Sequence, residues 1–129
     1  MKLNTSGITM NQNTGMNHSQ KELFCDLHTH STFSDGSDTP TELLGKAEQA
    51  KLGAVALTDH NSVAGLPEFL TAAKDSTVIA VPGVEFTTAH EGKELHVVGL
   101  FIKEEVYEQV EDYCAPMRKA KETSNRLLI

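Results

Sequence analysis

The chain has 129 residues, with 11 Lys and Arg against 18 Asp and Glu, which gives a formal net charge of −7. This length suits one domain, and 39% hydrophobic with 22% charged residues is typical of a globular protein and not of a disordered one. The acidic balance argues against broad binding to nucleic acid or anionic membranes. No apolar run reaches the about 20 residues of a membrane helix, and no secretory pattern is present, so we expect a cytoplasmic protein.

Residues 1–22 are rich in Asn, Thr, Ser and Gln and predict a flexible leader, followed by one domain over residues 23–129. The domain is expected to begin with a buried strand over 23–28 and a polar loop over 29–38. Thr39, Pro40 and Glu42 then predict a helix start with a capping box, and Gly53 predicts the helix end.

Further elements are expected to alternate along the chain. The pattern predicts a strand over 54–57, a helix over 64–73, a strand over 78–81, a turn over 90–93 and a strand over 95–102. Strands that alternate with helices are typical of a parallel sheet with covering helices, which is the α/β class.

The last segment has apolar residues at alternating steps of four and three from Val106 to Leu127, which is the pattern of an amphipathic helix. Pro116 stands inside this pattern, and proline disrupts a helix interior. We therefore predict two helices that cover the sheet, separated near residues 114–116.

Side chains suited to metal or acid–base chemistry lie close to the predicted strand ends: His28, His30, Asp35, Asp59, His60, Glu85 and His96. Side chains at i and i+2 of an extended chain point to the same side, so the first two imidazoles can converge on one cation. Open α/β sheets and α/β barrels place their active sites at the carboxyl ends of strands. Imidazole and carboxylate together suit Zn, Mn or Fe.

Each of these signals is weak by itself. A lone His-x-His pair is more often no metal site, and a strand-end carboxylate is more often a helix cap or a surface hydrogen bond. The metal-site hypothesis depends on the coincidence that consecutive strands each deliver a histidine or a carboxylate. For His18, in the leader, and His90, in a turn, we expect solvent exposure and no role.

Five short motifs follow one another in a recognisable order: Asp-Leu-His-Thr-His-Ser (26–31), Ser-Asp-Gly (34–36), Thr-Asp-His-Asn (58–61), Pro-Gly-Val-Glu (82–85) and Glu-Leu-His (94–96). They closely resemble the successive motifs of the PHP (polymerase and histidinol phosphatase) family. The resemblance covers residues 23–102.

The resemblance implies the N-terminal portion of a distorted, TIM-like (β/α)7 barrel with two or three divalent transition metals (Zn, Mn or Fe) at the strand carboxyl ends. Carried over by motif, His28, His30 and Glu85 would hold one metal. Glu85 would bridge to a second metal that His96 also binds. Asp35 and His60 would hold a third. Asp59 would be an outer residue that orients the imidazoles.

The activity implied is hydrolysis of a small phosphoester, such as a nucleotide or a histidinol-phosphate-like substrate, by metal-activated hydroxide. In the family each metal takes a further ligand from the C-terminal half, an Asp, a His and another His, and this chain ends at Ile129 before any of them. We therefore expect the first half of the fold, either as a truncation or as a reduced family member, with self-association through the open half-barrel. The alternatives are a non-catalytic metal-binding fragment and an exonuclease module of a DNA polymerase.

Overall fold

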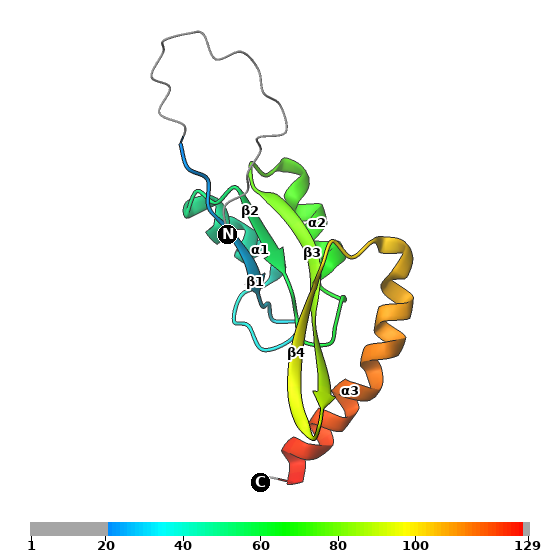
Figure 1. The fold of residues 1–129 in the computed structure, drawn as a ribbon. Coiled ribbons are helices and arrows are strands. Elements are labelled where there is room, and N and C mark those ends of the chain that lie inside the picture. Colours follow the sequence, from blue (N-terminus) through cyan, green and yellow to red (C-terminus); the bar gives the residue numbers. More distant parts are fainter. Residues whose placement is uncertain (1–20, 128–129) are drawn as a thin grey trace, which may run out of the picture.

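A computed structural model describes residues 21–127, so the predicted leader lies outside the described residues except for its last two positions. The elements, in chain order, are β1 (Cys25–Thr29), α1 (Pro40–Gln49), β2 (Ala54–Leu57), α2 (Leu66–Ala72), β3 (Ile79–His90), β4 (Lys93–Leu100) and α3 (Tyr107–Leu127), with short 3-10 turns at Ala73–Asp75 and Glu104–Val106. The sheet order is β1-β2-β3-β4 (Figure 1). β1, β2 and β3 are parallel and connected through helices, which confirms the α/β class.

Helix α1 begins as its sequence predicts. The Thr39 hydroxyl accepts a hydrogen bond from the Glu42 amide, and the Glu42 carboxylate accepts one from the Thr39 amide, which completes a capping box. The C-terminal end of α1 comes earlier than the predicted end at Gly53. The helix ends at Gln49, and Lys51 adopts the left-handed conformation with φ 57°.

The fourth strand departs from a wholly parallel sheet. β3 continues past the predicted residue 81 to His90 and pairs antiparallel with β4 as a hairpin. Glu91 and Gly92 form the turn with φ 49° and 76°, the left-handed pair that a tight two-residue hairpin requires. So short a connection can join only antiparallel strands, because a parallel pair needs a crossover.

The predicted break at Pro116 is wrong. Residues Tyr107–Leu127 form one helix that includes the proline. Proline removes a single intrahelical hydrogen bond, and the Lys, Ala, Glu and Arg residues around it are good helix formers, so the helix continues. Cys114, within the expected break, is fully buried against the core.

The core lies between the sheet and its helices. Leu44 of α1, Phe69 of α2 and Val55, Leu57 and Val84 of the sheet are almost completely buried in it. In Figure 1 the β3–β4 hairpin extends beyond the three parallel strands, with α3 alongside it. Within residues 21–127, every helix is too short or too polar to span a bilayer.

We propose that isolated copies of the chain associate through the edge strand β1. Two large apolar side chains are exposed just before this edge strand: Leu23 is 54% and Phe24 57% exposed. We expect the mean mass measured by light scattering to rise toward twice the monomer mass with concentration. Phe24→Lys should lower it and Thr77→Lys, a control at another exposed position, should not. A monomer at every concentration contradicts the proposal.

Candidate metal centre

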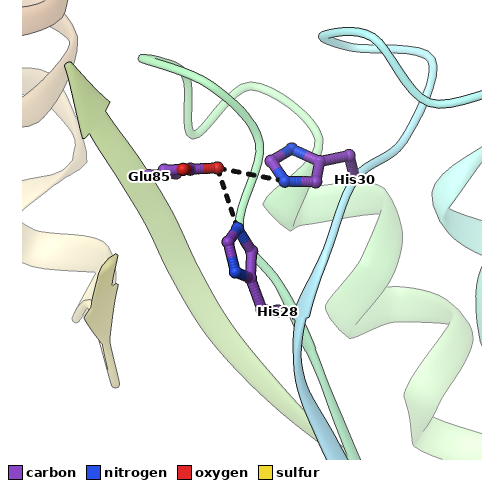
Figure 2. Close-up of side chains that lie close together, drawn as sticks. All are labelled: His28, His30 and Glu85. Carbon is purple, nitrogen blue, oxygen red and sulfur yellow. Dashed lines mark hydrogen bonds and ion pairs between the residues drawn. The ribbon is translucent and has the colours of Figure 1, made fainter. Parts of the chain in front are cut away.

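The centre of the site is the carboxylate of Glu85, which lies within β3 and is only 5% exposed. Its Oε2 lies 2.8 Å from Nε2 of His28 and 3.0 Å from Nε2 of His30 (Figure 2). Its Oε1 lies 2.9 Å from Nδ1 of His96, and Nδ1 of His60 is 3.5 Å from Oε2. Four imidazoles from different parts of the sequence therefore surround one buried carboxylate.

His28 and His30 reach this carboxylate from β1 and the residue after it. Their rings point to the same side, with centroids 5.0 Å apart, as the i, i+2 spacing predicts. Thr29, between them, points to the other side, where its hydroxyl donates to the carbonyl of Ala56 at 2.6 Å. This anchor on β2 fixes the backbone that carries both histidines.

His60 is positioned by backbone pairing that continues beyond the end of β2. The Glu85 amide donates to the Asp59 carbonyl at 3.0 Å, and the Asn61 amide donates to the Glu85 carbonyl at 2.9 Å. Asn61 has φ 48°, which Asn tolerates better than most residues. Its side-chain amide makes two hydrogen bonds to Thr87, one to the backbone and one to the hydroxyl, which ties the segment after His60 to β3.

His96 enters the site through strand register and not from a strand end as expected. It pairs with Thr87, two residues after Glu85 on β3, so Glu85 and His96 project from the same face of the hairpin. Glu94 lies on this face too, and its Oε1 is 2.7 Å from Nε2 of His96. Glu94 is not among the predicted site residues, although its position two residues before His96 on a strand is a signal that the sequence carries.

Asp35 comes from the loop after β1. Its Oδ2 lies 3.2 Å from Nε2 of His60, and its Oδ1 lies 3.6 Å from Nδ1 of His30. The next residue must be glycine, because a Cβ on Gly36 would lie 2.2 Å from the carbonyl oxygen of His30. This close approach folds the loop back over the strand end and brings the Asp35 carboxylate to the two rings.

Asp59 is almost fully buried, and its carboxylate holds the same loop. It accepts hydrogen bonds from the amide and the hydroxyl of Ser31 and from the hydroxyl of Ser34, each at 2.7 Å. We expected Asp59 to orient the imidazoles. Its hydrogen bonds fix the loop that carries Asp35, and an orienting effect on the imidazoles stays a prediction.

Helix α3 contacts the segment after His60 through two residues that the sequence pattern did not single out. The Glu111 carboxylate accepts a hydrogen bond from the Val63 amide at 2.7 Å. Arg118 donates to the carbonyl of Asn61 and forms an ion pair with Glu111 at 2.9 Å. An apolar periodicity identifies the buried face of a helix, but it does not show which polar residues beside that face meet a distant loop.

The surroundings shift the protonation equilibria in opposite directions. Burial raises the pKa of Glu85, but hydrogen bonds with His28 and His96 outweigh it and hold the pKa below its usual value. Burial and the neighbouring His60 lower the pKa of His30, which favours the neutral imidazole. Hydrogen bonds to Glu94 and Glu85 raise the pKa of His96. The site therefore offers an ionised carboxylate beside a neutral imidazole, the protonation states that bind metal.

The donor set fits divalent transition metals. Three overlapping groups each bring together ligand atoms that lie within 4.8 Å of one another: His28, His30 and Glu85; His30, Asp35 and His60; His60, Glu85 and His96. Among residues 21–127, no hydrogen-bond partner meets the buried Nδ1 atoms of His30 and His60, which is costly unless another group satisfies them. Mixed nitrogen and oxygen donors suit Zn, Mn or Fe. All six predicted ligands thus lie in one site.

The fold and the site thus define an α/β protein with parallel strands and a candidate metal centre of clustered histidines and carboxylates. The sequence matches the PHP domain model over residues 26–118, and the chain belongs to this family. It is 45% identical over 75 residues to a 5'-3' exoribonuclease of Haemophilus influenzae, across 58% of this chain and 27% of that protein. It is 40% identical over 77 residues to a 3',5'-nucleoside bisphosphate phosphatase of Chromobacterium violaceum, across 60% and 27%.

Solved structures share the fold. An amidohydrolase of Chromobacterium violaceum with bound sulfate and no metal superposes with a TM-score of 0.73 at 32% identity, over 80% of this chain and 36% of that one. A Bifidobacterium adolescentis protein described as a metal-dependent phosphoesterase gives a TM-score of 0.69 at 28% identity, over 81% and 38%. The chain spans 27% of the first curated relative and 36% of a second, the exoribonuclease Rnm of Salmonella typhimurium. The chain thus corresponds to only part of the length of these relatives.

Asp59→Asn should destabilise the protein by about 2 kcal/mol, because the new amide group faces donors and leaves buried groups unpaired. Urea unfolding followed by circular dichroism measures this change. Ser34→Ala, which removes a single half-buried hydrogen bond, should cost about 1 kcal/mol. Asp75→Asn, at an exposed position, is the control. Equal stability of Asp59→Asn and the wild type contradicts the role of this network.

Proposed function

We propose that the chain carries the metal-binding half of a phosphoesterase that hydrolyses a small phosphorylated substrate. The observation that carries this proposal is the convergence of five further side chains with metal-ligating groups around the buried carboxylate of Glu85. Membership of the PHP family supports it, and the relatives include a nucleoside bisphosphate phosphatase and exoribonucleases.

In this proposal His28, His30 and Glu85 hold one ion, and Glu85 extends to a second ion together with His96. Asp35 and His60 hold a third ion. Zn, Mn and Fe suit these donors, and the bound ions would supply Lewis acids for phosphoryl oxygens and acidify a water. The chain's own contribution is to keep six donors in place: backbone pairing positions His60 and Glu85, and the loop held by Asp59 positions Asp35.

The proposed substrate class is a nucleotide-like phosphoester. Asp35 and His96 lie on the accessible side of the site, with side chains that are 67% and 33% exposed, so a substrate phosphate can approach there. An acidic protein can accept an anion at this point because the ions supply the positive charge. The similarity to exoribonucleases favours a second candidate, removal of nucleotides from the 5' end of RNA.

The freshly purified chain should contain at least one equivalent of Zn, Mn or Fe when measured by inductively coupled plasma mass spectrometry. Replacing both His28 and His30 by Ala should reduce the bound metal several-fold, because the group around Glu85 then loses two of its three donors. His90→Ala is a matched control, since His90 is exposed on the same hairpin as His96 and distant from the cluster. Absence of metal from the wild type, also after reconstitution with Mn or Zn, would rule out this part of the proposal.

An activity assay distinguishes a catalytic chain from one that only binds metal. With added Mn, the chain should hydrolyse p-nitrophenyl phosphate or a nucleoside 3',5'-bisphosphate, and the His28→Ala, His30→Ala double variant should lose at least about a hundredfold in rate, since a metal centre supplies several kcal/mol. A 5'-phosphorylated oligoribonucleotide tests the second candidate. Metal binding without turnover of any of these substrates would indicate a non-catalytic metal-binding fragment.

A further inference from the structure

The imidazole of His96 is held differently from the stacked imidazoles of His30 and His60. His96 lies on the two-stranded β3–β4 hairpin, outside the parallel part of the sheet, and its side chain is 33% exposed. The rings of His30 and His60 stack on each other with centroids 4.4 Å apart, whereas His96 meets His60 only at its edge, at 5.5 Å. Packing therefore restrains the orientation of the His96 ring less than that of the His30 and His60 rings.

We infer that Glu94 is a positioning residue that fixes the His96 ring so that Nδ1 faces the metal centre. The alternation of side chains along β4 puts Glu94 and His96 on one face of the hairpin. Oε1 of Glu94 is 2.7 Å from Nε2 of His96, while Nδ1 on the other side of the ring is 2.9 Å from Oε1 of Glu85. The ring is therefore held between two carboxylates, one inside the site and one outside it.

The hydrogen bond from His96 to Glu94 determines which ring nitrogen of His96 is free to bind metal. A neutral imidazole carries a proton on one nitrogen and a lone pair on the other. When Nε2–H donates to Glu94, the lone pair resides on Nδ1, and only that nitrogen points toward Glu85 and the cation sites. A carboxylate on the far side of a ligating histidine fixes the tautomer and raises the basicity of the ligand, and its loss typically weakens metal binding by about 10–100-fold.

Glu94 also contacts helix α3, which suggests a competing and purely structural role. Its Oε1 lies 3.6 Å from Nζ of Lys121, and both side chains are about half exposed. An exposed ion pair contributes little to stability, so this contact alone does not explain a carboxylate at this place. Lys121→Met removes the contact to α3 and keeps the hydrogen bond to His96, and this substitution separates the two roles.

The test measures zinc affinity of the full 129-residue chain by competition with a chelating dye. Glu94→Leu should weaken the tightest site that includes His96 by about tenfold. Glu94→Gln should recover part of the loss, because the amide oxygen still accepts the Nε2 proton. Glu91→Leu, which removes an exposed carboxylate from the same hairpin, and Lys121→Met should both stay within about twofold of the wild type.

A double-variant cycle shows whether Glu94 acts through His96. In a His96→Ala background, Glu94→Leu should have no further effect on zinc affinity. An equal tenfold loss in that background would overturn the inference, because Glu94 would then act by direct ligation or by long-range attraction. Unchanged affinity in the single variant would overturn it as well.

A second measurement needs no metal and no activity. Carbon-13 relaxation of the Cε1–H group of His96 should report an ordered ring in the metal-free chain and a mobile ring in Glu94→Leu, with the urea midpoint unchanged. The inference concerns the proposed metal site, but the two can fail separately. Zinc binding without phosphoester hydrolysis would remove the proposed activity only. Ring order that does not depend on Glu94 would remove the positioning role, whether or not the wild type binds zinc.

Discussion

The site depends on the contacts between the buried carboxylate of Glu85 and the imidazoles around it. An ionised carboxylate that is 5% exposed needs hydrogen-bond donors or cations around it, since burial of an unpaired charge costs several kcal/mol. His28 and His96 each lie within 3 Å of one of its oxygens. Because these rings come from the first and the last strand of the sheet, Glu85 connects the whole sheet through one side chain. The same carboxylate, with the same rings, offers the donors that a divalent cation requires.

A second group of polar residues fixes the geometry of the ligands without touching the centre. Asp59 holds the loop of Asp35 through Ser31 and Ser34, and Asn61 ties the segment after His60 to β3. Glu111 and Arg118 of α3 hold that segment from the other side. The Val63 amide and the Asn61 carbonyl are backbone groups outside the named helices and strands, and α3 supplies their hydrogen-bond partners. The loops are thereby ordered at the places where ligands leave the sheet.

The charge of the protein and the charge of its proposed substrate are compatible at this site. A formal net charge of −7 repels phosphorylated molecules over most of the surface. Divalent ions bound beside Glu85 and Asp35 would reverse the local charge, so an anion is accepted only where metal is held. The exposed side chain of Asp35, beside the half-buried His60, lies at the open side of this centre.

The sequence alone was sufficient to predict the family, the six candidate ligands and most of the helices and strands. Its local signals are strong, because a capping box, a His-x-His pair and an apolar run each depend on neighbouring residues. Thr39 and Glu42 cap α1 as predicted, and the strand over 54–57 has the predicted bounds. The continuation of the helix through Pro116 was missed, since the proline penalty is local whereas the packing of Cys114 against the core is not.

What the tertiary structure decided was how distant residues meet. The turn at Glu91 and Gly92 makes β4 antiparallel, and the resulting register, not a strand end, brings His96 to Glu85. The contacts of Asp59 with Ser31 and Ser34 also join separate segments, so periodicity along the chain could not reveal them. A sequence records which donors are present and in what order, because these are properties of single residues and short motifs. Only the folded chain fixes which nitrogen of an imidazole faces the centre, since that depends on partners from other strands.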